Sequence, residues 1–218
     1  MHNRYAHWAN RKTGNEREAG KKKVNRHRVV KRAKVLNAKQ LETLLDFVEN
    51  GRHPLRDRVM ILLSYKAGLR SQEIAGLDWS ALCDAEGELH TEYFTVGSHI
   101  AKYGHERAIS MHVDLYIALE ALRDARPNGT AVIYGVRKPR MSPNNVTVYF
   151  HELYKKLGFQ GCSSHSGRRT FITSLARKAN LHGCSLKDVQ LAAGHRQLSS
   201  TECYLEPSPN IGRLVASI

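Results

Sequence analysis

The sequence has few cysteines, and no two of them stand at the spacing of a metal-binding or redox pair. The four are far apart along the 218 residues: Cys83, Cys162, Cys184 and Cys203. This pattern argues against a disulfide framework and is typical of reduced thiols in a cytosolic protein. Cys162 with His165, and His182 with Cys184, offer four potential zinc ligands. However, C-x-x-H followed by H-x-C is not a usual ligand spacing, so we expect no metal site.

The sequence also lacks any apolar run long enough to cross a bilayer, and its N-terminus lacks the apolar segment of a secretory signal. We therefore expect a cytoplasmic protein that does not span a membrane. Acidic residues are scarce: 20 Asp and Glu stand against 34 Lys and Arg, a formal charge of +14. This excess indicates a polyanionic partner, nucleic acid first and an anionic membrane surface second. With 41% hydrophobic residues, the chain is nevertheless globular.

The positive charge is concentrated at the start of the chain. Residues 1–34 contain twelve Lys or Arg and two Glu, so they carry +10 of the net +14. Apolar residues are too sparse in this segment to offset the entropy of ordering it. We expect residues 1–34 to be a flexible basic arm and residues 35–218 to be one domain. A solubilising tail or a cloning remnant is the alternative interpretation of the arm.

Hydrophobic spacing and capping residues predict an α+β fold that is mainly helical, with one small antiparallel sheet or hairpin. Two short segments rich in β-forming residues, 89–96 and 106–112, flank a loop with glycine at both ends and predict the hairpin. Ser71 and Ser164 are expected to be the N-caps of two helices. The expected helices cover residues 37–51, 55–68, 71–77, 114–126, 142–158, 164–178 and 185–194.

Several segment ends carry polar groups that are suited to phosphate chemistry. His165 and Arg168 are three residues apart at the start of a helix, so we expect them on the same face, where two donors converge on one anion. Taken singly, each candidate has an ordinary structural explanation. Arg70 is placed to form a surface ion pair with Glu73, for example, and His195 to cap a helix. The candidates are Arg70, Lys102, His165, Arg168, His195 and Tyr204.

In their order and spacing, these segments resemble the motifs of the tyrosine recombinase, or phage integrase, family. "YKAGLRSQEIAGLDW" is similar to the first-arginine box, with Arg70 as the arginine and Glu73 as its acidic companion. "AKYGHERAISM" is similar to the lysine box of a β-hairpin, which assigns the lysine to Lys102. "HSGRRTFIT" matches the H-x-x-R box through His165 and Arg168.

The last motif combines two elements of the family. "LAAGHRQLSSTECYL" resembles the L-G-H box followed by the nucleophile segment, with His195 as the histidine and Tyr204 as the nucleophile. The resemblance covers about residues 36 to 206. Its departures are Arg169 in place of a second histidine, Ala193 in place of leucine and Ser110 in place of proline. The motifs are similar to those of the catalytic half of Xer-type recombinases. We expect only the basic arm, without a separate core-binding domain, before them, much as in the small fimbrial phase-variation recombinases.

The resemblance implies a site-specific DNA recombinase or integrase, a DNA strand transferase without cofactor or metal. Its partner would be double-stranded DNA, on which the protein self-associates as a tetramer, and no membrane is involved. Tyr204 would form a 3′-phosphotyrosyl intermediate, Arg70 and Arg168 would hold the phosphate oxygens, and Lys102 would be the general acid.

The two histidines have less definite roles in this mechanism. His195 would hydrogen-bond the phosphate, and either His165 or water would be the base. Two alternatives stay open. One is a DNA-binding regulator of the same fold without turnover, and the other is DNA relaxation of the type IB topoisomerase kind.

Overall fold

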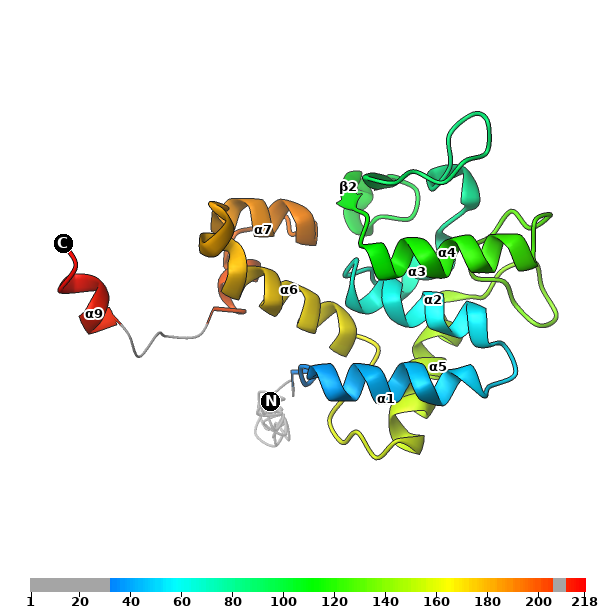
Figure 1. The fold of residues 1–218 in the computed structure, drawn as a ribbon, viewed down its shortest axis with the longest axis horizontal. Helices are drawn as coiled ribbons and strands as arrows, with labels where there is room; N and C mark the ends of the chain where they lie inside the picture. Colours follow the sequence, from blue (N-terminus) through cyan, green and yellow to red (C-terminus); the bar gives the residue numbers. More distant parts are fainter. Residues whose placement is uncertain (1–31, 206–210) are drawn as a thin grey trace, which may run out of the picture. The chain divides into compact units, whose positions relative to one another are not determined.

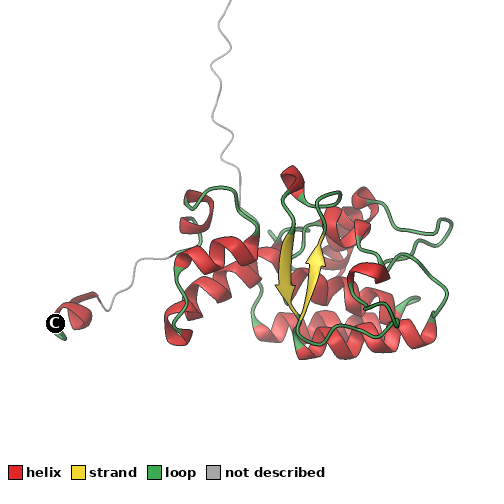
Figure 2. Ribbon diagram, turned by 90° about the horizontal axis from the view of Figure 1, so that it is seen from above, coloured by secondary structure: helices red, strands yellow, loops and turns green. Residues whose placement is uncertain are grey.

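The computed structural model describes residues 32–205 and 211–218, and its elements confirm the expected α+β fold, mainly helical with one two-stranded antiparallel sheet (Figures 1 and 2). The α-helices are α1 (Ala38–Glu49), α2 (Pro54–Tyr65), α3 (Ser71–Gly76), α4 (Val113–Ala125), α5 (Pro143–Lys156), α6 (Ser166–Lys178), α7 (Leu186–Ala193), α8 (Ser199–Glu202) and α9 (Ile211–Val215). The remaining elements are the 3-10 helices η1 (Trp79–Ala81), η2 (Lys102–Gly104) and η3 (Ala179–His182) and the strands β1 (Tyr93–Val96) and β2 (Arg107–Ser110).

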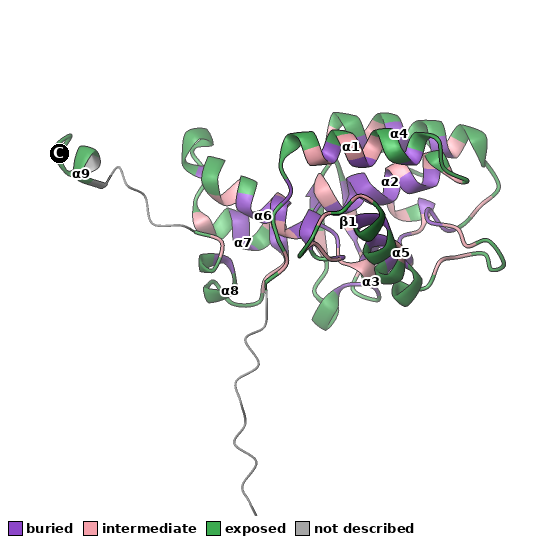
Figure 3. Ribbon diagram, turned by 90° about the horizontal axis from the view of Figure 1, so that it is seen from below, coloured by how far each residue is buried: buried purple, intermediate pink, exposed green. Residues whose placement is uncertain are grey.

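Helix α2 lies at the centre of the core. Five consecutive apolar residues, Val59 to Leu63, are all buried, because a helix that is apolar on every side must be covered on every side. Helices α1, α3, α4 and α6 pack against it. Figure 3 shows the buried α2 beneath α1 and α4, whose outer faces are exposed. The residues at both ends of α2 are therefore held by packing on several neighbours.

The two strands form the predicted hairpin. Phe94 of β1 is paired with Ile109 of β2, and both side chains are buried. Because side chains alternate along a strand, Arg107 shares this inner face with Ile109. Its partner across the sheet is Val96, which is also buried. The hairpin therefore directs one arginine toward the interior of the domain.

Helix α6 approaches α2 closely at Gly167. A Cβ atom added to Gly167 would lie 3.0 Å from the Cβ of Ser64 and 3.1 Å from its carbonyl carbon. Only glycine allows the two helices to come so near. This contact seats the first turn of α6, which carries the H-x-x-R residues, directly on the end of the central helix.

A second, smaller apolar cluster joins α6 to the segments that follow it. Ile172, Ala179, Val189 and Ala193 are buried together, and Tyr204 packs against them. Helix α7 begins with the predicted capping box, in which the hydroxyl of Ser185 accepts from the backbone of Asp188. It ends at Gly194, which adopts the left-handed conformation (φ +61°) that favours glycine.

Two predicted N-caps are wrong. Ser71 is the first residue of α3, and Arg70 is the cap, because Glu73 reaches back to accept the backbone N–H of Arg70 at 2.8 Å. At the next site the cap is His165 rather than Ser164. There Ser166 donates its N–H to the carbonyl of Ser163 and accepts the Ser163 N–H with its hydroxyl, so a turn precedes the helix.

The predicted basic arm, residues 1–34, lies outside the described residues except for its last three. Within these, the N–H of Lys34 donates to the carbonyl of Gly161 at 3.1 Å. The boundary between arm and domain therefore stays a prediction. Among residues 32–205 and 211–218, no helix has both the length and the apolar character needed to cross a membrane.

Candidate active site

Arg70 is held at the start of α3 by a buried carboxylate. Its Nη1 donates to Glu73 Oε1 at 3.1 Å, and its Nη2 lies 3.5 Å from the carbonyl oxygen of Gly194. Burial by itself would raise the pKa of Glu73, but hydrogen bonds and charge from Arg107 and Arg70 outweigh it, and this pKa lies below its ordinary value. Glu73 is therefore ionised, and it orients the guanidinium of Arg70.

Arg168 is buried and links two segments that are far apart along the chain. Its Nη1 donates to the carbonyl of Gly68 and its Nη2 to that of Ala193, both at 2.6 Å. Only 5% of the residue is exposed. Burial and the charge of Arg70 lower the pKa of Arg168 to about 9. Arg70 thus adds positive charge near Arg168, while the carboxylate of Glu73 is hydrogen-bonded to Arg70 and Arg107. The positive charges exceed the one negative charge, which favours a bound anion.

His165 belongs to the same electrostatic cluster. Desolvation lowers its pKa below the usual value, and the charges of Arg168, Arg70 and Lys102 lower it further. Near neutral pH the imidazole is therefore uncharged, so one ring nitrogen is free to accept a proton. The expectation that His165 and Arg168 lie together at the start of one helix is confirmed.

His195 follows the glycine that ends α7 and contacts the predicted nucleophile. Its Nδ1 lies 2.9 Å from the hydroxyl of Thr201, which is fully buried. The ring stacks on Tyr204 with 5.8 Å between centroids and 25° between planes. Burial and the charges of Arg168 and its neighbours lower the pKa of His195 to about 4. The ring is therefore neutral at physiological pH and fixed in orientation.

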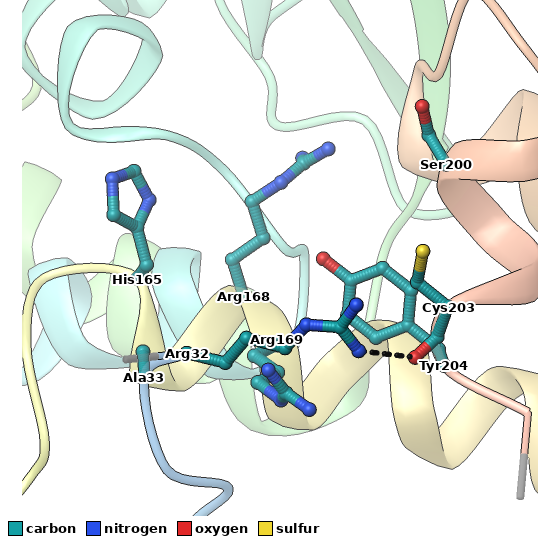
Figure 4. Close-up of a pocket in the computed structure, with 8 residues that line it drawn as sticks. All are labelled: Arg32, Ala33, His165, Arg168, Arg169, Ser200, Cys203 and Tyr204. Atoms are coloured by element: carbon teal, nitrogen blue, oxygen red, sulfur yellow. Dashed lines mark hydrogen bonds between the residues drawn. The ribbon is translucent and has the colours of Figure 1, made fainter. Parts of the chain in front are cut away.

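A pocket of about 320 Å³ opens beside Tyr204 (Figure 4). Arg32 donates from Nη1 to the carbonyl of Cys203 at 3.4 Å across one side of it, and the guanidinium of Arg169 lies 5.7 Å from the Tyr204 ring centroid. The pocket is lined by Arg32, Ala33, His165, Arg168, Arg169, Ser200, Cys203 and Tyr204.

Lys102 stands apart from this pocket. It is exposed in η2, on the loop between the two strands, where its Nζ lies 4.9 Å from the ring centroid of Tyr103. Tyr103 itself has φ +67°, which is unusual for a residue with a side chain. Among the described residues, the other five predicted site residues lie in one cluster. Lys102 interacts with this cluster only through its charge, which lowers the pKa of His165.

Sequence reasoning missed two residues of this cluster, Arg107 and Thr201. Arg107 binds Glu73 through two hydrogen bonds of 2.8 Å, and Thr201 holds His195. A signal for Arg107 existed, because it alternates with the apolar Ile109 and so occupies the inner face of a strand, where a charge needs a partner. Nothing comparable in the sequence singles out Thr201.

The zinc ligands considered from the sequence do not come together in the part of the chain that the structure describes. Within it, no group of three or more His, Cys, Asp or Glu side chains is arranged to hold a metal ion. His165, one of the four candidates, instead lines the pocket beside Tyr204.

Comparison with known proteins gives consistent results. A family model described as the phage integrase family matches residues 34–210. The tyrosine recombinase XerC of Pelobacter propionicus is 28% identical over 167 residues, which cover 73% of this chain and 50% of the relative. The tyrosine recombinase XerA of Pyrococcus horikoshii is 25% identical over 175 residues, 78% of this chain and 56% of the relative. The chain thus spans about half the length of these relatives.

Among solved structures, the integrase of transposon Tn1549, in complex with a circular-intermediate DNA, has a similar fold. Its TM-score is 0.65 at 20% identity, and the match covers 85% of this chain and 66% of that one. At this identity the likeness concerns the fold alone.

Proposed function

The chain belongs to the phage integrase family, and on this premise we propose that it is a tyrosine-type site-specific DNA recombinase. Its substrate would be double-stranded DNA, which it cleaves and rejoins through a covalent 3′-phosphotyrosyl intermediate. The observation that carries the proposal is the position of Tyr204. Its ring borders a pocket that Arg168 and His165 also line, and it stacks on His195.

The chemistry begins with attack of the Tyr204 hydroxyl oxygen on the scissile phosphorus. A new P–O bond forms to the tyrosine while the bond from phosphorus to the 5′-oxygen of the next nucleotide breaks. The proton of the tyrosine passes to a base, and the departing 5′-oxygen takes up a proton from an acid. The ester retains the energy of the broken bond, so a 5′-hydroxyl from another strand can reverse the step without ATP.

The two arginines would stabilise the phosphate as its charge grows in the transition state. Arg168 uses two of its five N–H groups on carbonyl oxygens, and Arg70 is oriented by Glu73. The remaining donors are available to the non-bridging oxygens. Both arginines are held before DNA arrives, so little reorganisation is needed when the reaction occurs.

The histidines and the lysine would handle the protons. A neutral His165 is suited to accept the tyrosine proton, with water as the alternative base, and a neutral His195 retains one N–H to donate to the phosphate. Lys102 would protonate the 5′-oxygen. Because it lies on an exposed loop, we propose that the β1–β2 loop moves toward the phosphate when DNA binds.

Strand counting supports self-association on DNA. Two duplexes contain four strands, and each Tyr204 holds one 3′ end, so complete exchange would occupy four copies of the chain. The solved neighbour from transposon Tn1549 is itself a complex with DNA, which supports DNA as the partner. We propose a tetramer on DNA, residues 1–34 as a basic arm that tracks its phosphates, and the cytoplasm as the location.

The nucleophile can be tested by trapping the covalent intermediate. The substrate would be a pool of short duplexes that tile the DNA flanking the gene, each nicked at a different position. Cleavage next to a nick releases a short oligonucleotide, so the adduct cannot religate and survives denaturation in SDS. We expect the wild type to form the adduct and Tyr204→Phe to form none while binding the pool nearly as well. Tyr93→Phe, which changes an exposed tyrosine on β1, is the matched control.

Three outcomes would count against the proposal. An adduct that persists in Tyr204→Phe contradicts the choice of nucleophile. Binding of the pool by the wild type without any adduct contradicts turnover and favours a DNA-binding regulator. Relaxation of a supercoiled plasmid that carries none of the flanking DNA favours a topoisomerase.

A further inference from the structure

Arg107 lies at the junction of three elements that carry proposed site residues. It is on β2, five residues after Lys102, and its side chain is only 8% exposed. We infer that Arg107 is a positioning residue, which holds Glu73 and thereby leaves Arg70 free to bind the scissile phosphate. This inference rests on the proposed function.

The contacts of Glu73 are shared between two arginines. Nη1 and Nη2 of Arg107 donate to Oε1 and Oε2, each at 2.8 Å, in a two-pronged pair. Arg70 donates to the same two oxygens, from Nη1 to Oε1 at 3.1 Å and from its backbone N–H to Oε2 at 2.8 Å. Glu73 has no exposed surface, so protein donors rather than bulk water satisfy its charge. Its orientation is therefore set by Arg107 as much as by Arg70.

The balance of charge explains why the second arginine matters. Glu73 and Arg70 alone would form a neutral pair, in which the guanidinium N–H donors of Arg70 would be directed at the carboxylate. With Arg107 present, the three side chains carry a net charge of +1, and Arg107 makes the shorter side-chain contacts to both carboxylate oxygens. Arg70 thus keeps guanidinium donors and positive charge for an external anion.

A second contact links Arg107 to the loop that carries His195. A Cβ atom added to Gly194 would lie 2.8 Å from the Cδ and 3.0 Å from the Nε of Arg107, so the arginine packs directly on the residue before His195. Helix α7 and strand β2 are neighbours at this point. One side chain therefore touches both the Arg70 segment and the His195 segment, and it follows the Lys102 loop along the chain.

The test compares two variants. Arg107→Gln loses the charge and the two parallel N–H donors of the guanidinium, whereas Arg107→Lys keeps the charge. On the duplex recovered in the trapping experiment, we would measure duplex affinity separately from the single-turnover rate of adduct formation. We expect affinity to change little and the rate to fall by about 100-fold for Arg107→Gln, the cost of a small misplacement of a catalytic group. Arg107→Lys should recover part of the rate, since it restores the net charge without the two parallel donors.

A double-mutant cycle separates positioning from a general structural role. If Arg107 acts through Arg70, then Arg107→Gln combined with Arg70→Ala should be no slower than Arg70→Ala alone. A methylphosphonate at the scissile position is neutral, so less positive charge from Arg70 is needed to stabilise it. A duplex with this substitution should therefore reduce the rate defects of both single variants in parallel. Loss of folding alone would not respond to the charge of the substrate.

The control is an arginine–carboxylate pair at the other end of α3. Arg140 donates to Asp78 at 2.7 Å and to the carbonyl of Gly76 at 2.8 Å. Arg140→Gln should lower the melting temperature but leave the rate of the folded protein unchanged. If Arg107→Gln does not fold, the cycle is run with Arg107→Lys.

Two results would overturn the inference: wild-type rates in both Arg107 variants, or a double variant whose loss is the product of the two single losses. Failure of the proposed function looks different, because the wild type itself would then form no adduct.

Discussion

His195 should make the domain less stable as the pH falls, and His195→Gln should remove that contribution. The ring is stacked on Tyr204 and bonded to Thr201, and Arg168 and Arg70 add positive charge nearby. Protonating it would place a further cation in a partly buried cationic cluster. The cost of doing so is absent in the unfolded chain, where the ring is in water.

The sign and size follow from the two pKa values. The folded pKa is about 4 and the ordinary value is 6.5, so between these limits the unfolded chain binds more protons than the folded one. The contribution of His195 to the free energy of unfolding is therefore fully present above about pH 6.5, and it decreases as the pH falls toward 4. At about 1.4 kcal/mol for each unit of pKa, the largest possible loss is about 3 kcal/mol. Because His195 is only partly buried, screening by solvent reduces this to roughly 1 to 3 kcal/mol.

Urea unfolding at a series of values between about pH 7.5 and pH 4.5 measures the effect. Glutamine does not titrate, so the stability of His195→Gln relative to the wild type should rise as the pH falls. His53, His112 and His165 also have lowered pKa values, but both proteins retain them and their effects cancel in the difference. His151→Gln, an exposed change on α5, is the control for replacing a histidine by glutamine. Parallel loss of stability in His195→Gln and the wild type would refute the reasoning.

Three further predictions concern packing, metal and the arm. Gly167→Ala should destabilise the domain by about 1 to 3 kcal/mol in urea unfolding, because its Cβ would press on Ser64. Gly212→Ala, which has open space around it, should not destabilise the domain. Equal effects of the two substitutions would contradict the close packing of α6 on α2. Adduct formation should survive EDTA, since Arg70 and Arg168 supply the positive charge, and a loss restored by magnesium would contradict this. Residues 1–31 contain ten Lys or Arg. Deleting them should reduce the slope of log affinity against log salt concentration by about 0.9 for each phosphate that the arm neutralises, on cognate and random duplexes alike. If only the cognate complex weakens, the arm reads bases.

Helix boundaries could be predicted where the deciding contacts are local. Asn37 with Gln40 caps α1, Ser142 caps α5 through the N–H of Asn145, and Ser185 caps α7, all over a distance of three residues. In such caps a short side chain satisfies a backbone group of the same turn, so the sequence contains both partners. The fold class followed from the same local patterns.

The wrong cap of α3 lies at a place where a distant partner takes part. Ser71 would cap α3 if Glu73 were in solvent, but Arg107, 34 residues beyond Glu73, holds that carboxylate in the interior. The carboxylate then accepts the backbone N–H of Arg70, and the helix begins one residue earlier than a serine cap would place it. No window of the sequence short enough to predict a helix contains this arginine.

The sequence by itself determined which chemical groups are available and in what order: a tyrosine, two arginines, two histidines and a lysine at the spacing of the phage integrase motifs. Side-chain identity is covalent, so it can be read without a fold. Only the tertiary structure decided the state of these groups. It commits two donors of Arg168 to carbonyl oxygens 100 and 25 residues away and holds His195 neutral. Hydrogen bonds and pKa values depend on burial and on charges that are distant along the chain, which is why they appear only once the chain is folded.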